Sequence, residues 1–120
     1  MHGLQKDIDL SFLNGRELIQ VAVGLYQTIF RFDEDVGISV EGEFSYFDGQ
    51  AEWIWKPEPC SSLIAARTVA LLGATIESFE SNANDTLALT FSNGHRLTLV
   101  DSSKEYESYQ ITRPGETIVV

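Results

Sequence analysis

Apolar and polar residues alternate along most of this chain, and this period of two constrains its fold more than any other feature. The clearest run extends from Val36 to Tyr46, where every second residue is apolar except at Gly42. Successive side chains of a β-strand point to opposite faces of a sheet, so this run predicts a strand with one buried face. Residues typical of tight turns separate the runs, which predicts neighbouring antiparallel strands.

Turn residues set the register expected for the first four strands. Gly24-Leu25 and Asp48-Gly49 are each typical of a two-residue hairpin turn, whereas the acidic tip 33–35 fits a three-residue loop. A shift of one residue would move every side chain to the other face, so the apolar pattern selects among these turns. All four strands then share one apolar face, which bears both tryptophans. The expected pairs are Val23 with Tyr26, Ile19 with Phe30, Phe30 with Ile38, Phe44 with Trp53, and Gly42 with Trp55.

A helix is expected between the two halves of the chain. The segment 63–72, LIAARTVALL, contains three alanines and a single charge, Arg67. Ser61 or Ser62 is a typical N-terminal cap, and Gly73 is a typical residue to follow the last turn. A pair of buried strands is the rival interpretation, which the alanines disfavour. A helix this apolar is expected to pack across the sheet.

The second half of the chain repeats the hairpin pattern. The turn 92–94 fits a three-residue loop with its glycine in the left-handed region, because a two-residue turn would pair a leucine with a threonine. Ile76 and Phe79 break the alternation of their strand, which predicts a bulge or an early end. The expected pairs are Leu89 with Leu97 and Leu87 with Leu99, and further strands are expected at 107–112 and 117–120.

The elements together predict an α+β fold. The 120 residues are expected to form a single domain, 1–120. Most connections are hairpins, so we expect a largely antiparallel, strongly curved sheet of about 7–8 strands. One main helix is expected to pack on the concave, aromatic face of that sheet. The architecture would be a roll or a half-open barrel.

Acidic residues outnumber basic ones by 18 to 8, which gives a net charge of −10. Nucleic acids and anionic membranes are therefore unfavourable partners, since binding to phosphates requires clustered Lys and Arg. Acidity favours a basic protein partner through long-range attraction, although it also serves solubility alone. No run approaches the roughly 20 apolar residues of a membrane helix, and the N-terminus lacks the apolar core of a secretion signal. With one cysteine, Cys60, no internal disulfide can form, and we expect a cytoplasmic protein.

The sequence contains no recognisable catalytic, metal-binding or cofactor-binding motif. His2 and His95 lack the spacing of metal ligands, and neither a phosphate-binding glycine loop nor a nucleophile elbow is present. Cys60 is better explained as a partly buried small residue than as a nucleophile. Glu41 and Glu43 alternate with apolar residues, so we expect them on a solvated face. We therefore expect no catalytic residues, no metal and no cofactor, and an enzyme is the least favoured class.

Two groups of residues are candidates for binding. The segment 101–111, DSSKEYESYQI, is expected to be a strand after a capped turn, with its polar face exposed. Tyr106 and Tyr109 fall on opposite faces of such a strand, and we expect Tyr109 in the core and Tyr106 at the surface. The candidate interaction surface comprises Asp101, Glu105, Tyr106 and Glu107. The candidate pocket, on the concave face, is lined by Phe44, Trp53 and Trp55.

Two segments resemble the hallmarks of a small, uncharacterised bacterial domain family. They are FLNGRELIQVAVGLYQTIFRFD at 12–33 and TLALTFSNGHRLTLVDSSKEYESYQI at 86–111. The family's pattern is a glycine-led hairpin, then a leucine-rich hairpin with an Asn-Gly type of turn, then a segment like Tyr106 to Tyr109. The resemblance covers most of the chain apart from 53–72, and it implies a bacterial origin without an activity or catalytic residues. Some members of the family occur near polymorphic-toxin genes, as immunity proteins do.

These observations favour a non-catalytic protein-binding module. In its sharpest form this is an immunity-like protein that masks a basic toxin. The alternative is a small-ligand carrier that uses the concave aromatic face as a pocket. A homodimer through an exposed edge strand is compatible with either function, because an open sheet has unpaired edges.

Overall fold

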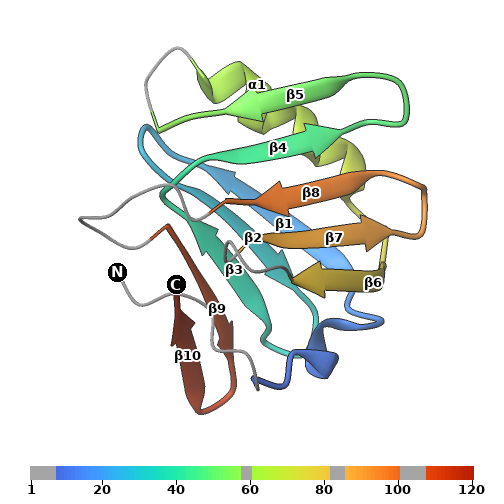
Figure 1. Cartoon of the computed structure of the whole chain (residues 1–120), viewed down its shortest axis with the longest axis vertical. Helices are drawn as coiled ribbons and strands as arrows, with labels where there is room; N and C mark the ends of the chain where they lie inside the picture. Colours follow the sequence, from blue (N-terminus) through green and yellow to red (C-terminus); the bar gives the residue numbers. More distant parts are fainter. Residues whose placement is uncertain (1–7, 58–60, 82–85, 101–107) are drawn as a thin grey trace.

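The computed structural model describes residues 8–57, 61–81, 86–100 and 108–120. Within them the chain forms two antiparallel five-stranded sheets that pack face to face, with their strands crossing steeply (Figure 1). The first sheet comprises, in spatial order, β1 (Leu18–Val23), β2 (Thr28–Phe32), β3 (Gly37–Val40), β9 (Tyr109–Arg113) and β10 (Glu116–Val119). The second comprises β5 (Glu52–Trp55), β4 (Phe44–Phe47), β8 (Arg96–Leu99), β7 (Leu87–Phe91) and β6 (Ile76–Ser81).

The β-rich, antiparallel character expected from the sequence is confirmed, whereas the single strongly curved sheet of about 7–8 strands is wrong. The ten strands in the described residues divide into two sheets, neither of which is closed or strongly curled. Alternation predicts which residues are buried, but it does not say which strands share a sheet. The architecture is therefore a β-sandwich with one short helical segment, and not a roll or a half-open barrel.

The core lies between the two sheets and is rich in aromatic rings. Phe44 of β4 meets Phe30 of β2 edge-on, with ring centroids 5.6 Å apart, and stacks on Trp55 of β5 at 5.2 Å. Phe32 of β2 and Phe91 of β7 also stack across the sheets, with centroids 6.4 Å apart. Each sheet thus buries the apolar face of the other, and this removal of apolar surface from water is the main stabilising term of the fold.

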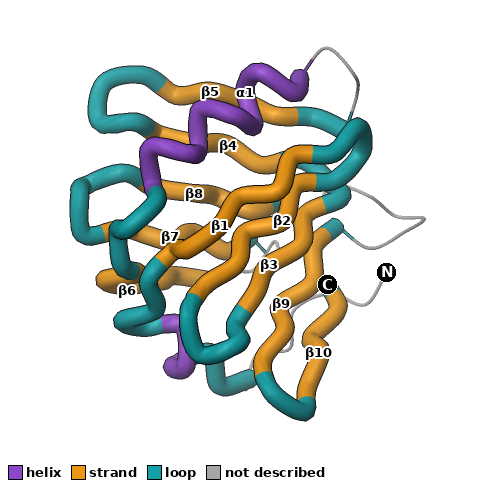
Figure 2. The backbone as a smooth tube through the Cα atoms, turned by 180° about the vertical axis from the view of Figure 1, so that it is seen from behind, coloured by secondary structure: helices purple, strands orange, loops and turns teal. Residues whose placement is uncertain are grey.

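A short helical segment fills the margin beside the first sheet. α1 (Ser62–Ala66) continues into a 3-10 turn, η3 (Arg67–Leu71); both contact β1, and α1 also contacts β5. Figure 2 shows the segment alongside β1, on the same side of the molecule as the first sheet. Only Ala65, Thr68 and Leu71 of the segment are buried. The expected apolar helix therefore exists. It covers only the β5 margin of the second sheet's inner face, because the first sheet packs on the rest of that face.

Two corners join the sheets. At one corner the chain passes from β3 to β4 through Gly42, whose N–H donates to the Ser108 carbonyl over 2.8 Å. A Cβ atom at Gly42 would lie 3.2 Å from the Ser108 Cα, so glycine permits this close approach. The expected position of Gly42 opposite Trp55 is therefore wrong. At the other corner an isolated bridge joins Glu17, just before β1, to Thr75, just before β6.

Two hairpins and one bulge follow the expected register. The acidic tip 33–35 closes the β2–β3 hairpin as a three-residue loop, and Gly94, with a φ of 86°, closes the β7–β8 hairpin. The register of β6 shifts between Ile76 and Ser78, which is the irregularity expected in this strand. Tyr109 is buried in the core, as expected. The confirmed pairs are Phe30 with Ile38, Leu89 with Leu97, and Leu87 with Leu99.

The first hairpin has a longer turn than its glycine predicts. Val23 pairs with Thr28 across a four-residue loop, 24–27, which a backbone hydrogen bond of 2.7 Å closes. This loop sets Val21 opposite Phe30, and an irregularity between Leu18 and Gln20 then sets Leu18 opposite Phe32. The expected pairs of Val23 with Tyr26 and of Ile19 with Phe30 are therefore wrong. Phe30 is buried in the core, whereas Ile19, Val23 and Tyr26 lie at the surface.

The β4–β5 hairpin also has a longer turn, yet its faces are preserved. Phe44 pairs with Trp55 and Tyr46 pairs with Trp53, two residues away from the expected register. The Asp48 carboxylate accepts hydrogen bonds from two backbone N–H groups of the turn, at 2.8 and 2.9 Å, which stabilises the longer loop. Because the shift is an even number of residues, both tryptophans stay on the expected side of the strand.

Candidate functional site

The acidic segment expected to form an interaction surface lies outside the described residues. Asp101, Glu105, Tyr106 and Glu107 all belong to the range 101–107, so their surface stays a prediction. Two other residues considered for chemistry, His2 and Cys60, also lie outside the described ranges. The site must therefore be sought among the residues of the sandwich and its loops.

The aromatic residues expected to line a pocket lie in and beside the core. Phe44 and Trp55 are fully buried and stack on each other. Trp53 is half-buried: its indole N–H donates to Asp48 over 3.0 Å, and the Arg67 guanidinium lies 3.6 Å from its ring centroid. These three aromatic residues do not line the hollow over the second sheet or the hollow at an end of the first sheet. The geometry gives them a role in packing.

A polar cluster joins the turns of two neighbouring hairpins in the second sheet. The hydroxyl of the buried Tyr46 lies 2.7 Å from His95 Nδ1, and His95 is half-buried. Burial raises the pKa of Tyr46. Hydrogen bonds from the Ala51 backbone, the Trp53 indole and a further backbone N–H lower the pKa of Asp48 to about 2. These contacts hold the two turns together. Among the described residues, no group of three or more His, Cys, Asp or Glu is placed to hold a metal ion.

The outer face of the first sheet is almost free of charge. Its outward side chains form two rows across all five strands, because the register sets outward residues of neighbouring strands opposite each other. Arg31 is the one charged residue in these rows, whereas a typical surface is about 25–35% charged. One row is Ala22, Ile29, Ser39, Gln110 and Val119, and the other is Gln20, Arg31, Gly37, Thr112 and Thr117.

Exposed apolar side chains border these rows. Eight large hydrophobic side chains are exposed among the described residues, and seven of them lie in the β1–β2 hairpin or in the helical segment beside it. The eighth, Ile54, lies on β5 in the second sheet. The seven are Ile19, Val23, Leu25 and Tyr26 of the hairpin, and Leu63, Val69 and Leu72 of the segment 62–72.

We name the two rows and six of these apolar side chains the neutral face; Val23 is left out because it pairs with the buried Thr28 and so points to the inner side of the sheet. Figure 2 shows the first sheet and the helical segment together on one side of the molecule. Monomeric proteins rarely expose contiguous apolar patches larger than a few hundred Å², and larger patches mark interaction sites. The centres of protein interfaces are likewise poor in charge and rich in aromatic side chains such as that of Tyr26. The neutral face therefore has the composition of a protein-binding surface.

Acidic residues lie at the ends of the strands that form the neutral face, and we name them the acidic rim. Glu17 precedes β1, the tip 33–35 joins β2 to β3, Glu41 follows β3, and Glu116 begins β10. The last two residues of the tip have φ values of 58° and 57°, in the left-handed region that non-glycine residues rarely adopt. Glu17, the tip and Glu116 lie at one end of the sheet and Glu41 lies at the other, so charged residues flank the uncharged centre along the strand direction. Protein interfaces commonly have a polar rim.

The sequence contains a signal for the neutral face that alternation does not reveal. No charged residue occurs from Leu18 to Phe30, and Arg67 is the one charge from Ser61 to Gly73. An apolar, charge-free stretch fits a core and an interface equally well. The structure distinguishes the two possibilities for the expected helix. Its Leu63 is 79% exposed, so this side chain belongs to the surface and not to the core.

Comparisons with known proteins identify a family without adding an activity. No curated protein and no solved structure shows a significant match to the chain. No helix in the described part of the chain is both long and apolar enough to cross a membrane. The resemblance to an uncharacterised domain family is confirmed by a family model that matches residues 10–120. The chain belongs to DUF6188, a family of unknown function.

Proposed function

We propose that this chain is a non-catalytic protein-binding module and that it binds its partner through the neutral face. The observation that supports this function is the concentration of six of the eight exposed large hydrophobic side chains around a nearly uncharged sheet. A partner would remove that apolar surface from water, which contributes roughly 25 cal/mol for each Å² before the costs of association. Leu63, Tyr26 and Leu25, each at least 60% exposed, have the most surface to bury.

The width of the neutral face suits a protein partner. Neighbouring strands lie about 4.8 Å apart, so five strands span roughly 20 Å, and the helical segment extends the surface beyond β1. A standard protein interface covers about 800 Å² on each partner. Small molecules instead bind in concave pockets that enclose most of their surface. A broad sheet face with apolar side chains along one border therefore favours a protein.

The partner that fits this surface has an apolar centre and a basic periphery. The acidic rim and the net charge of −10 attract a basic protein during diffusion, which raises the association rate. The uncharged centre avoids the desolvation of buried charges when the surfaces meet. An immunity-like protein that masks a basic toxin would be such a pair. Asp101, Glu105, Tyr106 and Glu107 are further candidate contacts with a basic partner.

Affinity capture with matched variants tests the proposal. Tagged wild type, Leu63→Ser and Ile54→Ser are incubated with extract from the source cells at low and moderate salt. Both substitutions shorten an exposed aliphatic side chain, but only Leu63 belongs to the neutral face. We expect wild type and Ile54→Ser to retain the same basic protein, more weakly at moderate salt, and Leu63→Ser to retain much less of it. Equal retention by all three proteins would contradict the role of the neutral face.

The alternative function, a small-ligand carrier with an aromatic pocket, has less support. Phe44 is buried against Phe30 of the opposite sheet, and the buried Trp55 stacks on Phe44, which leaves packing as their evident role. One observation favours a guest in this part of the core: the buried Trp55 Nε1 has no hydrogen-bond partner among the described residues. Native mass spectrometry of the protein purified from its source would distinguish the alternatives, because a carrier should retain a small molecule and a protein-binding module should not.

A further inference from the structure

A second surface feature, separate from the neutral face, is a hollow at one end of the first sheet. Its volume is about 490 Å³. It lies where three segments meet: η1 (Ser11–Leu13) with the residues that follow it, the acidic tip, and the turn between β9 and β10. Two arginines, Arg16 and Arg113, line it, and none of its lining residues belongs to the neutral face.

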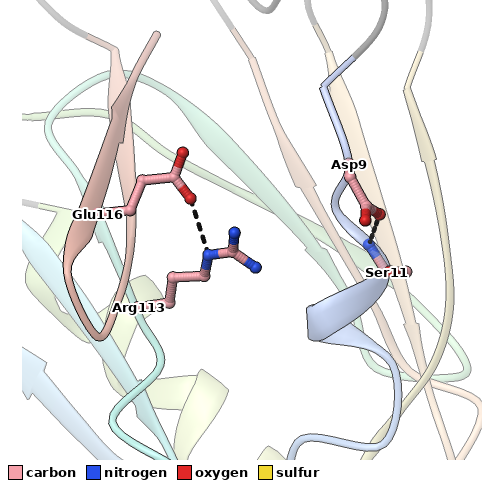
Figure 3. A network of polar contacts seen from close by, with 4 residues as sticks. All are labelled: Asp9, Ser11, Arg113 and Glu116. Atoms are coloured by element: carbon pink, nitrogen blue, oxygen red, sulfur yellow. Dashed lines mark hydrogen bonds and ion pairs between the residues drawn. The ribbon is translucent and has the colours of Figure 1, made fainter.

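Arg113 is held beside the hollow with most of its donors unused. Its Nε donates to Glu116 over 2.7 Å, and its guanidinium lies 4.6 Å from the centroid of the Phe12 ring. Figure 3 shows the guanidinium extending toward the side on which Asp9 and Ser11 lie. The Asp9 carboxylate accepts a hydrogen bond from the Ser11 N–H over 2.9 Å, and hydrogen bonding to Ser11 lowers the pKa of Asp9. A guanidinium has five N–H donors, and in Arg113 only Nε–H has an acceptor among the described residues.

Arg16 has even fewer of its donors satisfied. Its side chain is 26% exposed, and its Nε is buried without a hydrogen-bond partner in the described part of the chain. Its Nη1 lies 3.7 Å from Asp33 Oδ1, which is longer than a hydrogen bond. That carboxylate oxygen already accepts the Glu17 backbone N–H at 3.0 Å. A buried donor without a partner costs free energy. A ligand whose acceptor atom reached this guanidinium would remove that cost, which would favour its binding.

We propose that this hollow binds the oxyanion group, a carboxylate or a phosphate, of a small molecule. The planar N–H pairs of guanidinium groups match two oxygens of such a group, which makes arginine the usual residue for this recognition. Of the ten N–H donors on the two guanidinium groups, one has a hydrogen-bond partner among the described residues. The other lining side chains include polar Ser11 and Asn14, and apolar Phe12, Val36 and Pro114 that would contact the rest of the molecule.

The charge around the hollow sets the affinity to expect. Arg16, Arg113 and Glu34 line the hollow and give it a local net charge of +1, against −10 for the whole chain. Asp33 and Glu116 lie next to the two arginines and orient them, but they also lower the affinity for an anion. Binding should therefore be weak and saturable, and it should depend on the arginine geometry more than on the overall charge.

NMR titration of the full chain with sodium acetate, and separately with sodium phosphate, tests the proposal. Sodium chloride keeps the ionic strength constant, and the Nε–Hε signals of both arginines and the amide signals of 11–14 are followed. We expect saturable shifts of these signals with one or both oxyanions. A response to acetate alone would identify a carboxylate site, and a response to phosphate alone a phosphate site.

Two variants decide whether the hollow itself is responsible. Arg113→Gln should weaken binding by at least about ten-fold, because it removes the paired N–H donors. Arg96→Gln removes an exposed arginine of β8 that does not line the hollow, and it should leave the titration curves unchanged. Shifts that match those in sodium chloride alone, or that persist in Arg113→Gln, would overturn the proposal. Neither outcome would bear on protein binding through the neutral face, since the two surfaces share no residue.

Discussion

Thr28 offers a sharp test of the sandwich packing, because its buried hydroxyl has no hydrogen-bond partner. The residue is fully buried on β2, and its Oγ1 is unpartnered among the described residues. Such a hydroxyl costs about 1–3 kcal/mol, since it has lost its hydrogen bonds to water without replacing them. Thr28→Val replaces the hydroxyl by a methyl group of similar size and leaves the backbone pairing with Val40 intact. The free energy of unfolding should therefore increase.

The expected gain from Thr28→Val is about 1–2 kcal/mol, because part of the desolvation cost is already present in a compact unfolded chain. In a chain of 120 residues, 1 kcal/mol corresponds to about 4 °C in Tm, so Tm should rise by about 4–8 °C. Urea denaturation followed by the fluorescence of the two tryptophans gives the free energy, and calorimetry gives Tm.

Thr68 provides the matched control. It is also fully buried, but its Oγ1 donates to the Ala65 carbonyl over 2.6 Å. Thr68→Val removes a hydrogen bond that is made, so it should lower the free energy of unfolding by about 1 kcal/mol. If Thr28→Val proved as destabilising as Thr68→Val, the Thr28 hydroxyl must have a partner, such as a buried water, and the reasoning would be refuted.

Three further substitutions test the turns and the corner. Asp35→Gly should raise the free energy of unfolding by about 1 kcal/mol in urea denaturation, because glycine adopts the φ of 57° without strain; an unchanged or lower value would contradict strain at the tip. Gly42→Ala should lower the same quantity by about 1–3 kcal/mol, because its Cβ would press on the Ser108 backbone; wild-type stability would contradict that close approach. The pKa of Asp48 lies at about 2, below its ordinary value of 3.8, so its carboxylate contributes stability that is present above about pH 4 and lost as the pH falls through 2. Asp48→Asn should therefore flatten the loss of stability between about pH 4 and 2 in denaturation measurements, and an unchanged slope would count against the folded-state hydrogen bonds.

The sequence predicts individual hairpins well where the turn leaves one choice of register. The glycine of the turn 92–94 and the matching leucines on both sides admit only a three-residue loop, and the structure has that loop. The first hairpin fails because Gly24 begins a four-residue loop and β1 contains an irregularity, and neither leaves a mark in the alternation. Local patterns therefore predict the hairpins better than they predict how the hairpins combine.

The division into two sheets could not be read from the same patterns. A strand that packs on a helix and a strand that packs on a second sheet show the same alternation. Gly42 marks the corner where the chain changes sheets, but a glycine within a strand also fits a site that makes room for a large neighbour. The number of sheets depends on contacts between residues far apart in the sequence, such as Phe30 with Phe44 and Phe32 with Phe91.

The candidate site was harder to predict than the fold. Apolar content led to the expectation that the helical segment packs across the sheet, whereas Leu63, Val69 and Leu72 are exposed beside β1. The acidity of the chain does favour a basic partner, but the sequence alone does not show that the acidic residues lie at the ends of the strands around an uncharged sheet. Both features follow from which strands neighbour which.

The most direct test of the central claim is amide hydrogen exchange on the captured complex. Exchange is measured for the free chain and for the chain bound to the protein that it retains. Binding through the neutral face predicts added protection in the β1–β2 hairpin and in the segment 62–72, with little change in the β7–β8 hairpin of the second sheet. Protection confined to the second sheet, with the β1–β2 hairpin and 62–72 unchanged, would contradict the account.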